Sequence, residues 1–143
     1  MKIAIIGTGN VGATLGKQWA AQHEIRFGTR DPGSSKVKDL LAAAEEIAGW
    51  AKGARVVKAF NTLGAQNFLN PRFGGQVANM FICGDDVAAK STVGKLVEEL
   101  GFDLVDAGPL TSARLLEPLA MLWIRLAYAE GLGPEIAFKL LRR

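Results

Sequence analysis

Apolar residues follow two spacings along this chain. The short, almost continuous apolar run over residues 2–6 is typical of a strand buried on both faces of a sheet, and short segments over residues 25–28, 55–60, 80–84 and 103–106 are predicted to be further strands. Over residues 11–22, 36–52, 87–100 and 112–130, apolar side chains recur every three or four positions, which predicts amphipathic helices. A last short helix is expected to carry Ile136 to Leu141, and residues 61–79, rich in Asn and Gly, are expected to form a long loop.

This alternation of strands and helices predicts an α/β fold built on a parallel sheet with helices on both faces. Right-handed crossovers then give five strands in the order 2-1-3-4-5, counted along the chain, followed by C-terminal helices. A length of 143 residues is the size of one domain, so residues 1–143 are expected to fold as a single unit.

Composition excludes several classes of function. Lys and Arg total 17 against 14 for Asp and Glu, without the dense basic face that nucleic-acid binding needs. One cysteine and one histidine exclude a disulfide framework and a histidine-rich metal site. Because no signal-like start and no membrane-length apolar run is present, we expect a cytoplasmic protein that binds neither membrane nor metal.

A glycine motif follows the first predicted strand and opens the first predicted helix. It is Gly7, Thr8, Gly9, Asn10, Val11 and Gly12, in the pattern G-x-G-x-x-G that marks a Rossmann-like dinucleotide site. The first two glycines permit a tight turn and a close approach of the pyrophosphate, and the helix start attracts its phosphates. The alternative is a glycine-rich turn that binds no ligand.

The end of the second strand predicts which dinucleotide is bound. An NAD-binding protein places a carboxylate there for the ribose hydroxyls, whereas this chain has Thr29 and Arg30. A guanidinium can grip the 2′-phosphate of NADP through two hydrogen bonds, and Ser34, Ser35 and Lys36 add donors nearby. The competing interpretation makes Asp31 the acidic residue, shifted by one position, and would favour NAD.

The remaining polar candidates carry little chemistry. Asn61 follows the third strand at the carboxyl edge, where a ligand contact is expected. His23 is interpreted as a surface residue and Cys83 as a small core residue. An ion pair within one helix accounts for Arg114 and Glu117. Since no nucleophile, base or metal cluster remains, no catalytic residue is assigned, which suits hydride transfer between two cofactors that carry the chemistry themselves.

With these motifs the chain resembles the NADP oxidoreductases that depend on the deazaflavin coenzyme factor-420. Two later blocks, residues 54–62 with 70–75 and residues 106–110 with 113–119, look like signatures of that family. The resemblance implies NADP as cofactor and a deazaflavin as hydride acceptor. It covers nearly the whole chain, but a central segment of the family pattern is absent near Leu41 to Ala44, as in a natural minimal member or an engineered deletion.

Two functions are therefore compatible with the sequence. The first is an oxidoreductase that passes hydride between NADPH and a deazaflavin or flavin-like acceptor. The second is a non-catalytic NADP-binding module that keeps the fold and the phosphate site. The helix over 112–130 has more apolar surface than one side of a small sheet can cover, so residues 112–143 are also expected to form a homodimer interface, as the resemblance implies.

Overall fold

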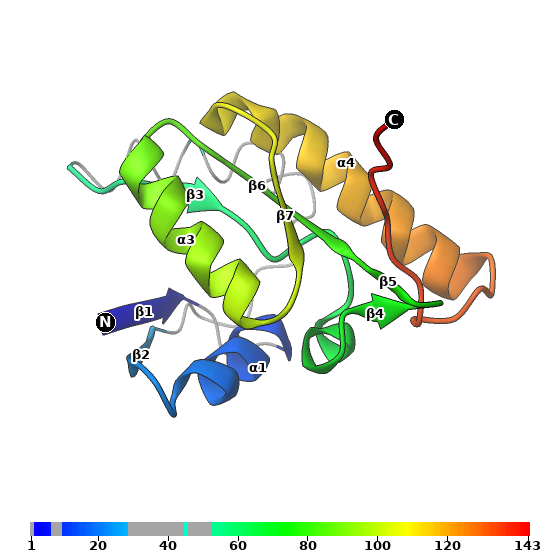
Figure 1. The fold of residues 1–143 in the computed structure, drawn as a ribbon, viewed down its shortest axis with the longest axis horizontal. Coiled ribbons are helices and arrows are strands. Elements are labelled where there is room, and N and C mark those ends of the chain that lie inside the picture. Colours follow the sequence, from blue (N-terminus) through cyan, green and yellow to red (C-terminus); the bar gives the residue numbers. More distant parts are fainter. Residues whose placement is uncertain (1, 7–9, 29–44, 46–52) are drawn as a thin grey trace.

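The computed structural model describes residues 2–6, 10–28, 45 and 53–143 (Figure 1). Its N-terminal unit consists of β1 (Lys2–Ile6), α1 (Asn10–Trp19) and β2 (Glu24–Gly28). β1 and β2 pair in parallel, in a register that runs from Lys2 opposite Glu24 to Ile6 opposite Gly28. Parallel neighbours need a crossover, which α1 supplies, so the predicted strand-helix-strand unit is confirmed.

A second sheet contains β3 (Val57–Lys58), β6 (Asn79–Gly84) and β7 (Asp103–Asp106), in the order β3-β6-β7. β6 and β7 are parallel, and α3 (Val87–Glu99) crosses between them. Asp86 caps α3 by accepting a hydrogen bond from the N–H of Ala89 at 2.7 Å. Gly94 lets α3 pack closely, because a Cβ there would lie 2.8 Å from Leu104 Cδ2.

The prediction of one five-stranded parallel sheet is confirmed only in part, and it is wrong for the direction of β3. Within the described residues the strands form separate sheets, and β3 runs antiparallel to β6. Val57 and Lys58 pair only with Gly84 and Cys83, at the end of β6. The chain cannot continue along the sheet because Phe60 has a φ of 62°, which turns the backbone away. The mixed α/β character is confirmed, but the order 2-1-3-4-5 is not.

The segment expected to be a long loop contains regular structure. A 3₁₀ helix, η2 (Ala65–Leu69), precedes the hairpin of β4 (Arg72–Phe73) and β5 (Gln76–Val77). Gly74 and Gly75 have φ values of 54° and 84°, the pair of positive angles that a two-residue type I′ turn needs. Two glycines between short β-forming runs are the sequence signal for such a hairpin, and the high Asn and Gly content obscured it.

The C-terminal helix forms as expected, but the last short helix does not. η3 (Leu110–Ser112) leads into α4 (Ala113–Ile124), which continues as the π-helical turn η4 (Arg125–Ala129). Residues 131–143 have no regular secondary structure instead. Their backbone is held by other elements: Ile136 O accepts from Trp123 Nε1 at 2.7 Å, and the N–H of Leu140 donates to Asn79 Oδ1 at 2.6 Å. Groups committed to these bonds cannot close a helical ladder.

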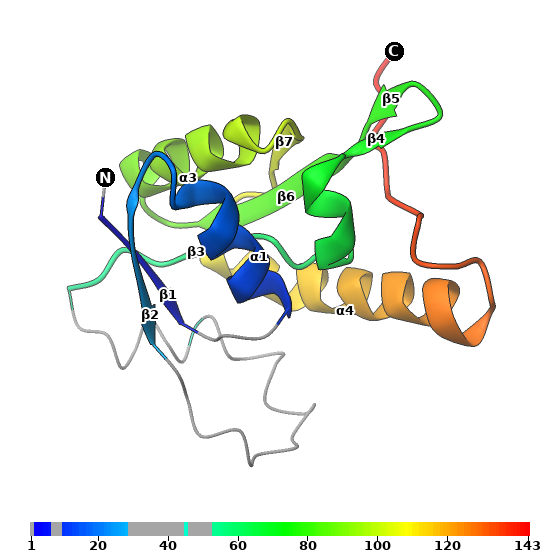
Figure 2. The same cartoon turned by 90° about the horizontal axis from the view of Figure 1, so that it is seen from below.

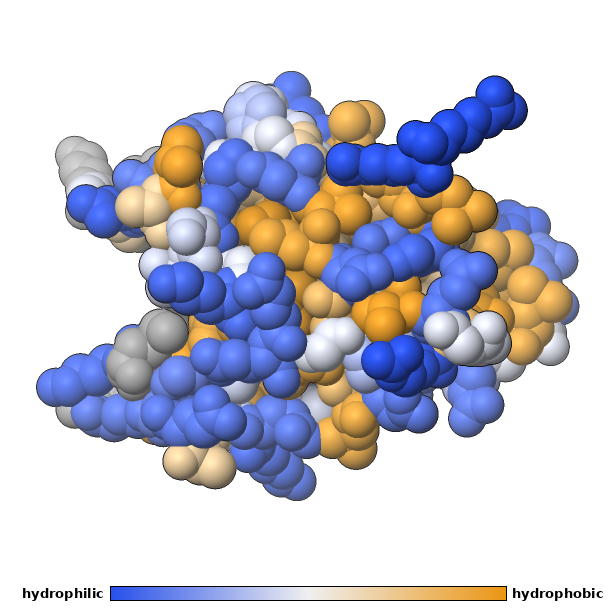
Figure 3. Space-filling model, in the orientation of Figure 1, coloured by the Kyte–Doolittle hydropathy of each residue, from blue (hydrophilic) through white to orange (hydrophobic). Residues whose placement is uncertain are grey.

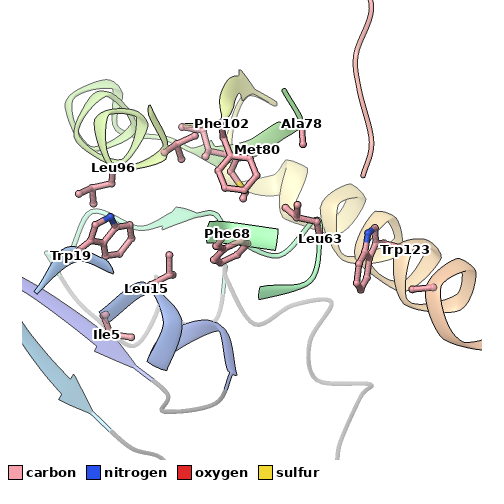
Figure 4. Packing of buried hydrophobic residues seen from close by; sticks show 13 residues of the cluster. Ile5, Leu15, Trp19, Leu63, Phe68, Ala78, Met80, Leu96, Phe102 and Trp123 are labelled. Atoms are coloured by element: carbon pink, nitrogen blue, oxygen red, sulfur yellow. The ribbon is translucent and has the colours of Figure 1, made fainter. Parts of the chain in front are cut away.

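A core of aromatic and aliphatic side chains joins the β1–β2 sheet to the sheet of β3, β6 and β7 (Figure 4). Phe68 of η2 is 1% exposed and lies edge-on to Phe102, with ring centroids 5.8 Å apart. Phe60 packs against Phe68 on one side and against Trp19 of α1 on the other, at 6.1 and 5.4 Å. No helix in the described part of the chain has both the length and the apolar character needed to cross a bilayer.

Replacing Phe68 with Ala should lower the free energy of unfolding by about 3–5 kcal/mol, because it removes a buried ring and leaves a cavity between the two sheets. Denaturant titration measures this. Leu69→Ala is the matched control, since the neighbouring Leu69 is 68% exposed and its loss should stay within about 0.5 kcal/mol. Equal losses in the two variants would contradict the placement of this core.

Candidate functional site

The glycine motif lies between β1 and α1, and the structure describes its second half. Asn10, Val11 and Gly12 open α1, with Asn10 and Val11 exposed and Gly12 partly buried. The other candidates for cofactor binding, and the competing Asp31, lie outside the described residues: Gly7, Thr8, Gly9, Thr29, Arg30, Ser34, Ser35 and Lys36. The segment near Leu41 to Ala44 also lies outside them, so these predictions stay predictions.

The first turn of α1 is suited to an anion. The first N–H groups of a helix have no intrahelical acceptor and carry the positive end of the helix dipole. α1 has ten residues and no acidic side chain in its first turn that would compete with a phosphate. Its start is therefore accessible to a negatively charged group.

Both views place the start of α1 beside the connection between β3 and η2, residues 59–64 (Figures 1 and 2). This connection carries Asn61, which is partly buried and whose Nδ2 donates to the carbonyl of Leu116 in α4 at 3.4 Å. A carbonyl can only accept, so the hydrogen bond determines which end of the Asn61 amide faces α4. Its Oδ1 is buried and has no hydrogen-bond partner among the described residues.

A buried ion pair lies next to this hydrogen bond. Lys58 of β3 binds Glu117 of α4, and each side chain is only 14% exposed. The predicted ion pair between Arg114 and Glu117 is therefore wrong, and Arg114 Nε instead lies 2.9 Å from Glu45 Oε2. Helical spacing alone makes Arg114 and Glu117 neighbours, but β3 brings a lysine to a more buried position than Arg114 can offer.

Cys83 and His23 are both structural. Cys83 is fully buried, as predicted, and burial raises the pKa of its thiol, although the nearby Lys58 opposes the shift. A thiol in this state is a poor nucleophile. His23 was expected at the surface, but its side chain is 9% exposed and its Nε2 lies 3.0 Å from Glu99 Oε2. That contact joins the turn before β2 to α3.

Asp106 marks the carboxyl end of β7. Lys90 Nζ lies 2.8 Å from its Oδ2, and the N–H of Gly108 donates to its Oδ1 at 2.9 Å. Desolvation raises the pKa of this carboxyl, but the hydrogen bonds from Lys90 and Gly108 outweigh it and lower the pKa below its usual value. Asp106 is thus held as an ion-paired carboxylate that closes the loop before η3.

A separate hollow of about 430 Å³ lies between η2, the β4–β5 hairpin and the C-terminal segment. Its wall includes Asn67, whose Nδ2 donates to the carbonyl of Pro134 at 2.9 Å. None of the predicted cofactor-binding residues lines it, but Asn70, Arg72, Phe73 and Gly74 of the family-like block 70–75 do. Within the described residues, no three His, Cys, Asp or Glu side chains gather in a way that could hold a metal ion.

The first turn of α1 thus has no acidic side chain that would repel a phosphate. The nearby connection between β3 and η2 carries Asn61, which donates a hydrogen bond to α4. Residues 2–62, which contain both, match the model of the family described as NADP oxidoreductase, coenzyme F420-dependent. The chain also matches, over 99% of its length and 100% of the other chain, a crystal structure from Arthrobacter sp. FB24 whose name assigns it to the F420-dependent NADP reductases. The TM-score is 0.82 at 27% identity. Residues 2–62 thus match the model of this family, and the whole chain is similar in structure to a protein named as one of its reductases.

Two further proteins are similar to this chain, one over part of its sequence and one in its fold. Metalloreductase STEAP3 of Rattus norvegicus is 40% identical over 79 residues, which are 54% of this chain but only 16% of that protein. The hypothetical protein SMa0349 of Sinorhizobium meliloti has the same fold, with a TM-score of 0.61 at 21% identity over 98% of this chain and 95% of its own. Taken together, the family match and these similarities support an NADP-dependent oxidoreductase in general terms.

Sequence analysis missed Lys58 as a residue of this site. The available signal was a lysine inside the otherwise apolar run Val56 to Phe60, where a buried charge needs a partner. Its partner, Glu117, is 59 residues away in the sequence, so no local spacing could identify it.

Proposed function

We propose that this protein binds NADP and passes hydride between NADPH and a deazaflavin or flavin-like acceptor. The observation that carries the proposal is the glycine motif that ends in the accessible first turn of α1, within the stretch that matches the family model. The name of the Arthrobacter protein, which refers to F420 and NADP, supports the choice of acceptor.

The residues fit the cofactor from its phosphate end. The N–H groups at Asn10, Val11 and Gly12 would hold the pyrophosphate, for which no acidic side chain competes in the first turn of α1. Arg30, with Thr29 and residues 34–36, would bind the 2′-phosphate. Asn61 would lie near the nicotinamide, on the connection beside the helix start.

Bound NADPH supplies the hydride, so the protein needs to position two ring systems and keep water from the transfer. The residues around Asn61 suit that role. Asn61 is tied to α4, and Phe60 beside it packs between Trp19 and Phe68. Hydride transfer itself moves no proton from the protein, and the one proton that the reduced acceptor takes up can come from solvent, so the proposal requires no acid or base among these residues.

Arg30→Ala should weaken NADP binding about tenfold or more and leave NAD binding nearly unchanged, because an arginine-phosphate contact contributes a few kcal/mol only where the 2′-phosphate exists. Isothermal titration with both dinucleotides measures the difference. Arg72→Ala is the control, an exposed arginine in the β4–β5 hairpin. Equal losses for NADP and NAD would make Arg30 a structural residue. If Asp31→Ala changes the preference between NADP and NAD, the alternative in which Asp31 is the acidic residue of an NAD site is favoured.

Mixing the purified protein with NADPH and a deazaflavin, or with free flavin, should oxidise NADPH and reduce the acceptor in equal amounts. Stopped-flow absorbance of the nicotinamide and of the acceptor follows both changes. NADPH binding without any transfer would leave the second function, a non-catalytic NADP-binding module. Binding of neither NADP nor NAD would refute both functions.

We also propose that residues 112–143 form a homodimer interface. The buried face of α4 and η4 consists of Ala113, Leu116, Ala120, Trp123 and Ala127. Large apolar residues also lie on the exposed side: Leu115, Met121, Leu122, Ile124, Tyr128 and Leu132. Figure 3 shows apolar side chains on the side of the molecule where α4 and η4 lie. An exposed apolar surface of this kind is typical of a protein interface.

Leu115→Glu combined with Leu122→Glu should convert the dimer to a monomer, because the two side chains lie seven residues apart on one exposed face of α4 and charge cannot be buried there unpaired. Sedimentation velocity measures the mass. Leu69→Glu, a change of an equally exposed leucine on η2, should leave the dimer intact. A wild-type protein that stays monomeric at micromolar concentration would contradict this interface.

A further inference from the structure

The backbone is strained at Phe60. Its φ of 62° makes it the only non-glycine residue with positive φ in the described part of the chain. For a bulky side chain this conformation is unfavourable, and it persists only where the surroundings hold it in place. Such positions are concentrated at functional sites, and Phe60 directly precedes Asn61.

Two sets of contacts hold this turn. On one side the ring of Phe60 packs edge-on between Trp19 and Phe68, with centroids at 5.4 and 6.1 Å. On the other side, the residues flanking Phe60 bind consecutive residues of α4. Lys58 pairs with Glu117, and Asn61 donates to the carbonyl of Leu116. Phe60 is thus held by two aromatic rings, and residues on both sides of it in the sequence bind the same turn of α4.

The ion pair is not explained by stability alone. Each partner is 14% exposed, so both charges lose most of their hydration. Removing one charge of such a pair is strongly destabilising, whereas two apolar side chains of similar size often serve equally well. A buried pair can nevertheless determine how two elements align, because its charges are satisfied in one arrangement only.

We propose that Lys58 and Glu117 are positioning residues that hold the turn at Phe60, and with it Asn61, against α1. Neither side chain is proposed to contact the cofactor. The pair acts through the backbone of residues 59–61, which places the Asn61 amide at the nicotinamide end of the site. The part of the inference that concerns NADPH rests on the function proposed above.

The test compares the wild type with Lys58→Met, with Glu117→Met and with the double variant. Each single variant leaves one buried charge unpaired and should have a lower denaturation midpoint. The double variant should recover the wild-type midpoint. Even so, amide hydrogen exchange over residues 59–63 should be at least about tenfold faster in the cofactor-free double variant, and its NADPH affinity about tenfold weaker, because apolar contact is less directional than an ion pair.

A control pair separates local from general effects. Lys90 and Asp106 join α3 to β7 by another ion pair, in which Lys90 is 15% exposed and Asp106 is 48% exposed. Lys90→Met with Asp106→Asn should leave both hydrogen exchange over residues 59–63 and NADPH affinity unchanged. The exchanged pair, Lys58→Glu with Glu117→Lys, should restore much of the protection over 59–63, and it covers the case in which the Met double variant does not fold.

The outcomes are distinct. Wild-type exchange over 59–63 in the Met double variant, or no restored protection in the exchanged pair, overturns the positioning role. Faster exchange with unchanged NADPH affinity also overturns it, because the held turn would then not serve the cofactor. A wild-type protein that binds no NADPH refutes the proposed function and the cofactor part of this inference, while hydrogen exchange still decides whether the pair holds the turn.

Discussion

Edge-on packing of Phe60 between Trp19 and Phe68 is the contact on which the described structure depends. Trp19 ends α1, and Phe68 belongs to η2 and reaches Phe102 next to β7. Because β1 and β2 form a sheet of their own, backbone hydrogen bonds do not join them to β6 and β7 within the described residues. Side-chain burial therefore has to supply that connection, and it does so through a residue with a strained backbone.

This constraint explains the mixed topology. A parallel strand between β1 and β6 would need several residues in extended conformation, whereas β3 has two before the backbone turns at Phe60. The turn brings the Phe60 ring into the core and leaves β3 paired only with the last residues of β6. Within the described residues, no backbone pairing joins β1 and β2 to β6 and β7, and the aromatic contacts of Phe60 connect them instead.

In the C-terminal segment, residues 131–143, contacts with other elements again outweigh the local preference of the sequence. Its apolar residues Ile136 and Phe138 pack on the core, as expected of an amphipathic helix, but the segment forms no helix. Asn79, Trp123 and Asn67 bind its backbone from three different elements. Hydrogen bonds from side chains that are already in place thus outweigh the weak helical preference of a short segment that follows two glycines.

The sequence by itself determined the local elements and the dinucleotide motif, because these depend on spacing between near neighbours. β1, α1, β2, α3, β7 and most of α4 agree with the apolar periodicity, and Gly7 to Gly12 form the pattern G-x-G-x-x-G within the stretch that matches the family model. Only the tertiary structure decided that β3 is antiparallel, that Glu117 pairs with Lys58 and that Asn61 is tied to Leu116. Each of these contacts joins residues more than 20 positions apart in the sequence. At such separations the local pattern is compatible with several partners, and the packing of the chain determines which partner is used.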